Sequence, residues 1–79
     1  MTAPELKKFW HAAPFAPFNI VLAGAEKSHV PHPDFLSVSP TGRIAYVWKK
    51  DDDHTAVDVM LITALETARN GRNDRRRRR

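Results

Sequence analysis

The sequence predicts a mainly β protein in which one N-terminal α-helix precedes five short antiparallel strands, strongly bent into a small barrel. Two prolines, Pro14 and Pro17, end any helix early in the chain. Short runs of alternating apolar and polar residues follow, and this alternation is typical of half-buried strands. From residue 70 onward there is no hydrophobic residue, so this end of the chain has no apolar surface to bury. We therefore expect a helix, a barrel and a disordered C-terminal tail.

The first helix is predicted from about Ala3 to His11. Thr2 is a good N-cap, Pro4 suits the first turn, and Glu5 lies where a capping box needs an acid. Three apolar residues at helical spacing form one stripe, which must pack against the sheet because so short a helix is unstable alone: Leu6, Phe9 and Trp10.

The first two strands are predicted over Phe18–Ala23 and Ala25–Val30, joined at Gly24. Phe18, Ile20 and Leu22 alternate onto one face of the first strand. Gly24 is expected to adopt a positive φ in the turn, since glycine does so without steric cost.

A corner rich in proline is predicted next. Pro31 and Pro33 lack the amide that a central strand needs, so the second strand ends there, and Asp34 is expected to form an Asx turn. The third strand is predicted over Phe35–Ser39 and the fourth over Arg43–Lys49.

In the fourth strand Ile44, Tyr46 and Trp48 share one face, and Ala45 and Val47 share the other. The Lys49–His54 stretch is predicted to be a solvated hairpin loop.

The fifth strand is predicted over Thr55–Met60. Leu61–Thr63 is then expected to break the chain for one turn, and Ala64–Thr67 to close the sheet. A helix over Leu61–Arg69 is the alternative interpretation, because this segment also has helical spacing.

Charge divides the chain into a folded domain, residues 1–68, and a tail, residues 69–79. The tail carries seven arginines and one acid, a net charge of +6, whereas the first 68 residues carry six Lys or Arg against eight acids, a net charge of −2. A domain this short is marginally stable alone, and without cysteine it has no disulfide or thiolate metal site. We therefore expect a homo-oligomer.

The sequence also bears on location. No run of about 20 apolar residues is present, so no membrane span is expected. The N-terminus lacks the basic-then-apolar order of a secretory signal. Both observations favour a cytoplasmic protein.

The helix-plus-five-strand layout resembles an Sm-like or SH3-like barrel. FNIVLAG, from Phe18 to Gly24, is similar to the first Sm signature, and Asp34-Phe35 to the turn that follows it. MLITAL, from Met60 to Leu65, resembles the join between the last two strands of the bacterial Sm-like RNA chaperone Hfq. The chain also resembles a set of short uncharacterised bacterial proteins with a PFxPFxIxLxxG…HPDF frame, over most of residues 6–67.

The Sm-like resemblance implies ring formation and the binding of single-stranded RNA. Two features depart from that family: Pro31 and Pro33 interrupt the second strand, and Val59 and Met60 stand where Hfq has a lysine–histidine pair. The RNA-binding residues of the family therefore do not map onto this chain. What carries over is assembly through a strand edge, which would cover unpaired backbone groups, with Val57, Val59 and Leu61 as the predicted edge residues.

No catalytic constellation is present, and we predict no enzyme activity, no cofactor and no metal site. His29, His32 and Asp34 are potential ligands, but residues three apart in a strand point to opposite faces. The consecutive acids Asp51–Asp53 are interpreted as a solubilising loop tip, because neighbouring acids in a row do not all converge on one ion.

The arginine-rich tail predicts a polyanionic partner. Closely spaced guanidinium groups repel one another, and a nucleic acid relieves this repulsion while it releases counterions. Arginine also stacks on unpaired bases, which favours a single strand, and the Sm-like resemblance favours RNA over DNA. The alternative is a protein-interaction or self-assembly module without a nucleic-acid role. The predicted nucleic-acid-binding residues are Arg69, Arg72, Arg75, Arg76, Arg77, Arg78 and Arg79.

Overall fold

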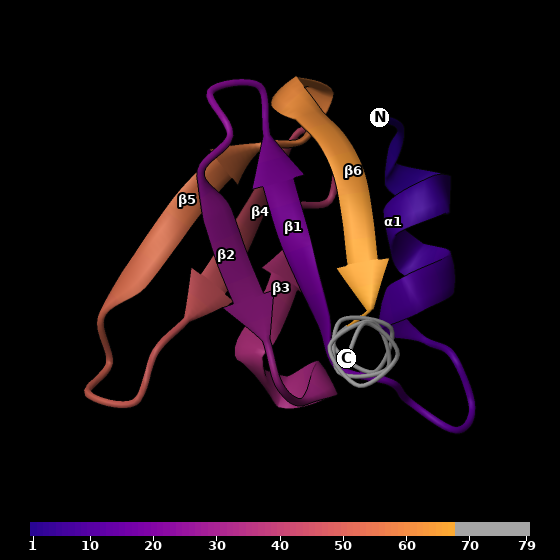
Figure 1. Ribbon diagram of the computed structural model, residues 1–79, viewed down its shortest axis with the longest axis vertical. Helices are drawn as coiled ribbons and strands as arrows, with labels where there is room; N and C mark the ends of the chain where they lie inside the picture. Colours follow the sequence, from indigo (N-terminus) through magenta and orange to yellow (C-terminus); the bar gives the residue numbers. More distant parts are fainter. Residues whose placement is uncertain (68–79) are drawn as a thin grey trace, which may run out of the picture.

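The computed structural model describes residues 1–67, which form two three-stranded antiparallel sheets and one α-helix (Figure 1). The first sheet has the strand order β2-β1-β6 and the second β3-β4-β5. The elements in chain order are α1 (Ala3–Trp10), β1 (Phe18–Leu22), β2 (Lys27–Val30), the 3-10 turn η1 (Pro33–Phe35), β3 (Leu36–Val38), β4 (Ile44–Trp48), β5 (His54–Asp58), the 3-10 turn η2 (Val59–Leu61) and β6 (Ile62–Thr67).

The mainly β class with one short N-terminal helix is confirmed, but the single five-stranded barrel is wrong. The described residues contain six strands in two open sheets. One cause is the corner at Pro31–Pro33, where the missing amides and the turn η1 separate β2 from β3. The other is that the closing segment is a full strand, β6, which pairs with β1 along its length.

Helix α1 begins as predicted and fastens the N-terminal end of the chain to the sheets. The Glu5 carboxylate accepts hydrogen bonds from the Thr2 amide at 2.9 Å and from the Thr2 hydroxyl at 3.1 Å. Leu6 is completely buried, and the Trp10 indole N–H donates to the Pro33 carbonyl at 3.0 Å. Within residues 1–67 there is no helix long and apolar enough to cross a membrane.

The β1–β2 hairpin places its positive φ one residue later than predicted. The Leu22 amide donates to the Glu26 carbonyl, so Ala23–Ala25 form a three-residue loop. In such loops the third residue is commonly left-handed, and Ala25 has φ 70°. Strand β2 consequently begins at Lys27 and not at Ala25.

The corner after β2 is a 3-10 turn and not an Asx turn. The His32 ring accepts a hydrogen bond from the Asp34 amide at 3.2 Å, and the Phe35 amide donates to the His32 carbonyl at 2.9 Å. The backbone donors at this corner are therefore satisfied by His32 and not by the Asp34 side chain.

The last two strands differ from the prediction in where the chain breaks. The break is the turn η2, whose first amide, that of Val59, donates to the Arg43 carbonyl at 2.9 Å. Strand β6 then pairs with β1 from Leu22–Ile62 to Phe18–Thr67. The alternative helix over Leu61–Arg69 is thus wrong for the described residues, and its last two residues lie outside them.

The buried side chains form one core cluster that contains residues from both sheets and Leu6 of α1. The Phe9 and Phe18 rings meet edge to face at 5.6 Å, which connects the helix to the central strand of the first sheet. The buried side chains are Leu6, Phe18, Ile20, Val30, Leu36, Ala45, Val47, Val57, Val59 and Ile62.

Candidate functional site

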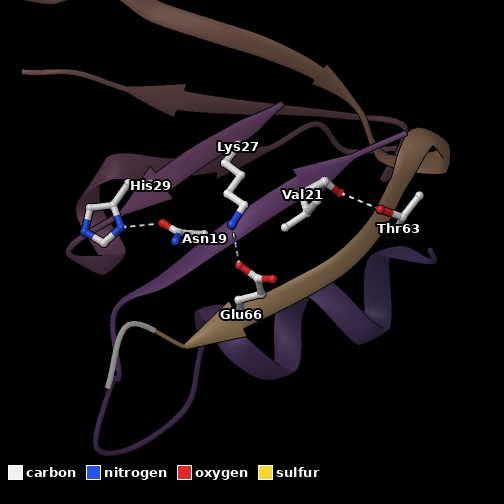
Figure 2. Close-up of polar contacts among 6 residues, drawn as sticks. All are labelled: Asn19, Val21, Lys27, His29, Thr63 and Glu66. Carbon is white, nitrogen blue, oxygen red and sulfur yellow. Dashed lines mark hydrogen bonds and ion pairs between the residues drawn. The ribbon is translucent and has the colours of Figure 1, made fainter. Parts of the chain in front are cut away.

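The outer face of the first sheet is polar, and its side chains pair with one another across strands (Figure 2). His29 Nδ1 lies 2.7 Å from Asn19 Oδ1, and Lys27 Nζ lies 3.1 Å from Glu66 Oε1. The Thr63 hydroxyl donates to the Val21 carbonyl at 3.2 Å. These polar groups find partners within the sheet itself, so this face offers few ready contacts to a ligand.

The outer face of the second sheet is aromatic. Tyr46 and Trp48 of β4 are 37% and 36% exposed, and His54 of β5 lies beside both rings. The His54 ring centroid is 4.9 Å from that of Trp48 and 6.0 Å from that of Tyr46. Tyr46 is flanked in register by two small residues, Ser37 and Ala56, and it remains 37% exposed. We call these three rings the hairpin face.

Strand alternation produces the hairpin face. Ala45 and Val47 are 0% and 2% exposed, so they point into the core and their neighbours along β4 point outward. The predicted division of β4 into two faces is therefore confirmed. The sequence had not indicated which face is buried, and the larger aromatic residues turn out to be the exposed ones.

The hairpin that carries this face is also the acidic part of the chain. Residues 44–58 contain two lysines, Lys49 and Lys50, against four aspartates, and this net charge of −2 equals that of the first 68 residues as a whole. Three of the acids, Asp51–Asp53, lie in the exposed turn next to Trp48 and His54. The fourth, Asp58, accepts a hydrogen bond from the Met60 amide at 2.9 Å.

A second apolar surface lies at η2. Met60 and Leu61 are 65% and 54% exposed, although both are large hydrophobic residues. The Leu61 carbonyl accepts a hydrogen bond from the Ala23 amide at 3.0 Å, so the turn of the β1–β2 hairpin lies next to them. This surface, Met60 and Leu61, is the apolar tip.

The three predicted edge residues are in different environments. Val57 lies in β5, an edge strand of the second sheet, but its side chain is 2% exposed. Val59 is 1% exposed, and Leu61 alone of the three presents its side chain to solvent. Contact with another chain would therefore use the backbone of β5 and the side chain of Leu61.

The predicted nucleic-acid-binding arginines, all within residues 69–79, lie outside the described residues. The two histidines that were considered as metal ligands make different contacts. His29 pairs with Asn19, and the ring of His32 lies 3.6 Å from the Asp34 carboxylate. Among residues 1–67, no three acidic or histidine side chains gather where they could share an ion.

An open, mainly apolar cavity of about 260 Å³ lies where α1 meets the end of β6. It is lined by Lys8, Phe9, Ala12, Ala16 and Thr67. Thr67, which lines this cavity, is the last described residue.

Comparisons of the chain with known protein families, with curated proteins and with solved structures find no match.

Proposed function

We propose that this protein binds nucleic acid, RNA in preference to DNA, and that its arginine-rich segment, residues 69–79, makes most of the contact. The observation that supports this best is the separation of charge along the chain. The segment carries +6, whereas the first 68 residues carry −2. A polyanion would thus be attracted to one short segment and repelled weakly by the rest.

The chemistry of arginine favours an unpaired strand. Guanidinium groups bind phosphates in a planar, two-pronged geometry and also stack on exposed bases. Neutralised phosphates release counterions, and this release supplies affinity without sequence preference. The five consecutive arginines at the end of the chain, Arg75–Arg79, are the strongest such group in the sequence.

We further propose that the protein acts as a small homo-oligomer. Each of its sheets is open, so β2, β6, β3 and β5 are edge strands. Edge strands carry backbone groups that can pair with another chain. Association would raise the number of arginine-rich segments per particle and so the avidity for a long polyanion.

The test is RNA binding by the full chain and by two variants in which Arg75–Arg79 are replaced together, by glutamine or by lysine. We expect the glutamine variant to lose most of its affinity for a single-stranded RNA oligonucleotide, measured by fluorescence anisotropy. The lysine variant should keep much of it, because lysine retains the charge. Equal affinity of the glutamine variant and the natural chain would contradict the proposal.

A second candidate is a protein-interaction or self-assembly module, and the apolar tip favours it. Its two exposed hydrophobic side chains, Met60 and Leu61, would be covered by such a contact. Leu61→Asp should abolish self-association in light scattering, whereas Ser37→Asp, at an exposed position on the outer face of β3, should not. Val59→Pro is unsuitable, because the Val59 amide donates to Arg43 and its side chain is in the core.

A further inference from the structure

We propose that the hairpin face is a docking surface for arginine side chains, and that its occupant is the C-terminal segment of the same chain, residues 68–79. The inference shares its arginines with the proposed function but does not require nucleic acid. Three observations support it: the aromatic rings, the exposed acids and the length of the segment.

The rings suit a guanidinium group. A cation over the face of Trp or Tyr, within about 6 Å of the centroid, is attracted by the ring quadrupole, and arginine does this more often than lysine. Tyr46 and Trp48 present partly exposed rings on the outer side of β4, where Ser37 and Ala56 are the direct cross-strand neighbours of Tyr46 and the His54 ring lies beside both.

The acids supply charge of the right sign. Asp51–Asp53 lie at the end of the hairpin face and are exposed. Within residues 1–67, none of the three lies within ion-pair distance of a basic side chain, although Lys49 and Lys50 precede them directly in the same turn. The net charge of −2 on residues 44–58 disfavours a nucleic acid on this face and favours a cationic segment.

The C-terminal segment is long enough to reach the hairpin face. Twelve residues follow Thr67, and fully extended they span up to about 40 Å. The two shorter dimensions of the molecule are 25 and 24 Å. The end of β6 and the turn between β4 and β5 lie toward the same end of the molecule (Figure 1). A tethered segment has a millimolar effective concentration, so it would occupy the face ahead of a second copy at micromolar protein.

The contact would make nucleic acid and the hairpin face competitors for one set of arginines. A polyanion that binds the segment would release it from the face, and the rings would then be uncovered. Because each exposed ion pair and each stacked cation contributes little, the contact should open readily.

The test is paramagnetic relaxation in the full chain. The sequence has no cysteine, so Arg79→Cys gives a single attachment point for a nitroxide label. We expect the amide signals of Tyr46, Trp48 and His54 to lose intensity, and those of Lys27 and His29, on the outer face of the first sheet (Figure 2), to keep it. The Trp10 indole N–H, bonded to Pro33, is a reference in the same spectrum.

Two matched variants identify the cause. Replacing Asp51, Asp52 and Asp53 together by asparagine should restore the lost intensity, and asparagine tolerates the φ of 67° at Asp52. Glu26→Gln, which removes an exposed acid from the β1–β2 turn, should change nothing. Replacing Arg75–Arg78 by lysine should weaken the effect, because lysine keeps the charge without the planar group.

Equal loss of intensity on both outer faces, or loss that appears only at high protein concentration, would overturn the inference. Persistence of the effect in the triple asparagine variant would also overturn it. Added single-stranded RNA separates the two proposals. RNA binding without selective broadening would refute the docking alone, and selective broadening without RNA binding would refute the proposed function alone.

Discussion

Leu6 and Leu61 are both leucines, but the first is buried and the second is exposed. Leu6 is 0% exposed in the core, and Leu61 is 54% exposed at the apolar tip. Leu6→Ala should lower the free energy of unfolding by about 2–5 kcal/mol, because it removes buried methyl groups and leaves a cavity. Leu61→Ala should change it by less than about 0.5 kcal/mol. Urea unfolding of both variants checks this, and a large loss at Leu61 would indicate that association contributes to stability.

Glu5 makes the stability of α1 depend on pH. The hydrogen bond from the Thr2 amide, then that from the Thr2 hydroxyl, lowers the pKa of the Glu5 carboxyl. A carboxyl with a lowered folded-state pKa stabilises the fold above its unfolded pKa, about 4.3, and this contribution is lost as the pH falls through the folded value.

Glu5→Gln should therefore lower the melting temperature at neutral pH, and the difference from the natural chain should shrink on acidification. Glu26→Gln is the control, since Glu26 lies in the exposed β1–β2 turn and its carboxylate accepts no hydrogen bond from Thr2. The measurement is thermal unfolding by circular dichroism between pH 7 and pH 3. A difference that stays constant with pH would contradict the role given to the carboxylate.

At the scale of elements, Gly24 of the β1–β2 turn lies one residue before the position that has a positive φ, which is occupied by Ala25. Ala25 has φ 70°, a conformation that costs an L-residue with a Cβ about 1 kcal/mol relative to glycine. Ala25→Gly should therefore stabilise the protein by up to about 1 kcal/mol. Ala23→Gly, in the same loop and without a positive φ, should not. Chemical unfolding of the two variants separates them, and a destabilised Ala25→Gly would contradict the account of the loop.

The elements themselves were largely predictable, because local rules dominate there. Helix α1 follows from Thr2, Pro4 and Glu5, and β4 follows from strict alternation. The break before β6 was placed too late, since Val59, Met60 and Leu61 are all apolar and give no turn signal. Its position is determined by two contacts remote in sequence, from Val59 to Arg43 and from Ala23 to Leu61.

At the scale of the whole molecule, the number of sheets could not be predicted from individual residues. Pro31 and Pro33 indicated that the second strand ends there, but this is expected both for a bent barrel and for two open sheets. The choice is made by the pairing of β1 with both β2 and β6, which leaves β3, β4 and β5 to form a sheet of their own.

Only part of the candidate site could be predicted from the sequence. Tyr46 and Trp48 were placed together on one face, but alternation alone does not indicate which side of a strand is buried. The decisive fact is that Ala45 and Val47 fill the space between the sheets. His54 joins the rings through the β4–β5 register, opposite Trp48, which only the paired structure shows.

The most direct test of the nucleic-acid proposal is the salt dependence of RNA affinity. For the full chain, the logarithm of the affinity for a single-stranded RNA should fall linearly with the logarithm of salt concentration. The slope should be about −3.5 to −5 if five to seven arginines each neutralise one phosphate. The variant with glutamine at residues 75–79 should bind weakly and with a shallow slope. A flat salt dependence of the full chain, or an unchanged slope in the variant, would contradict the proposal that these arginines bind the phosphates.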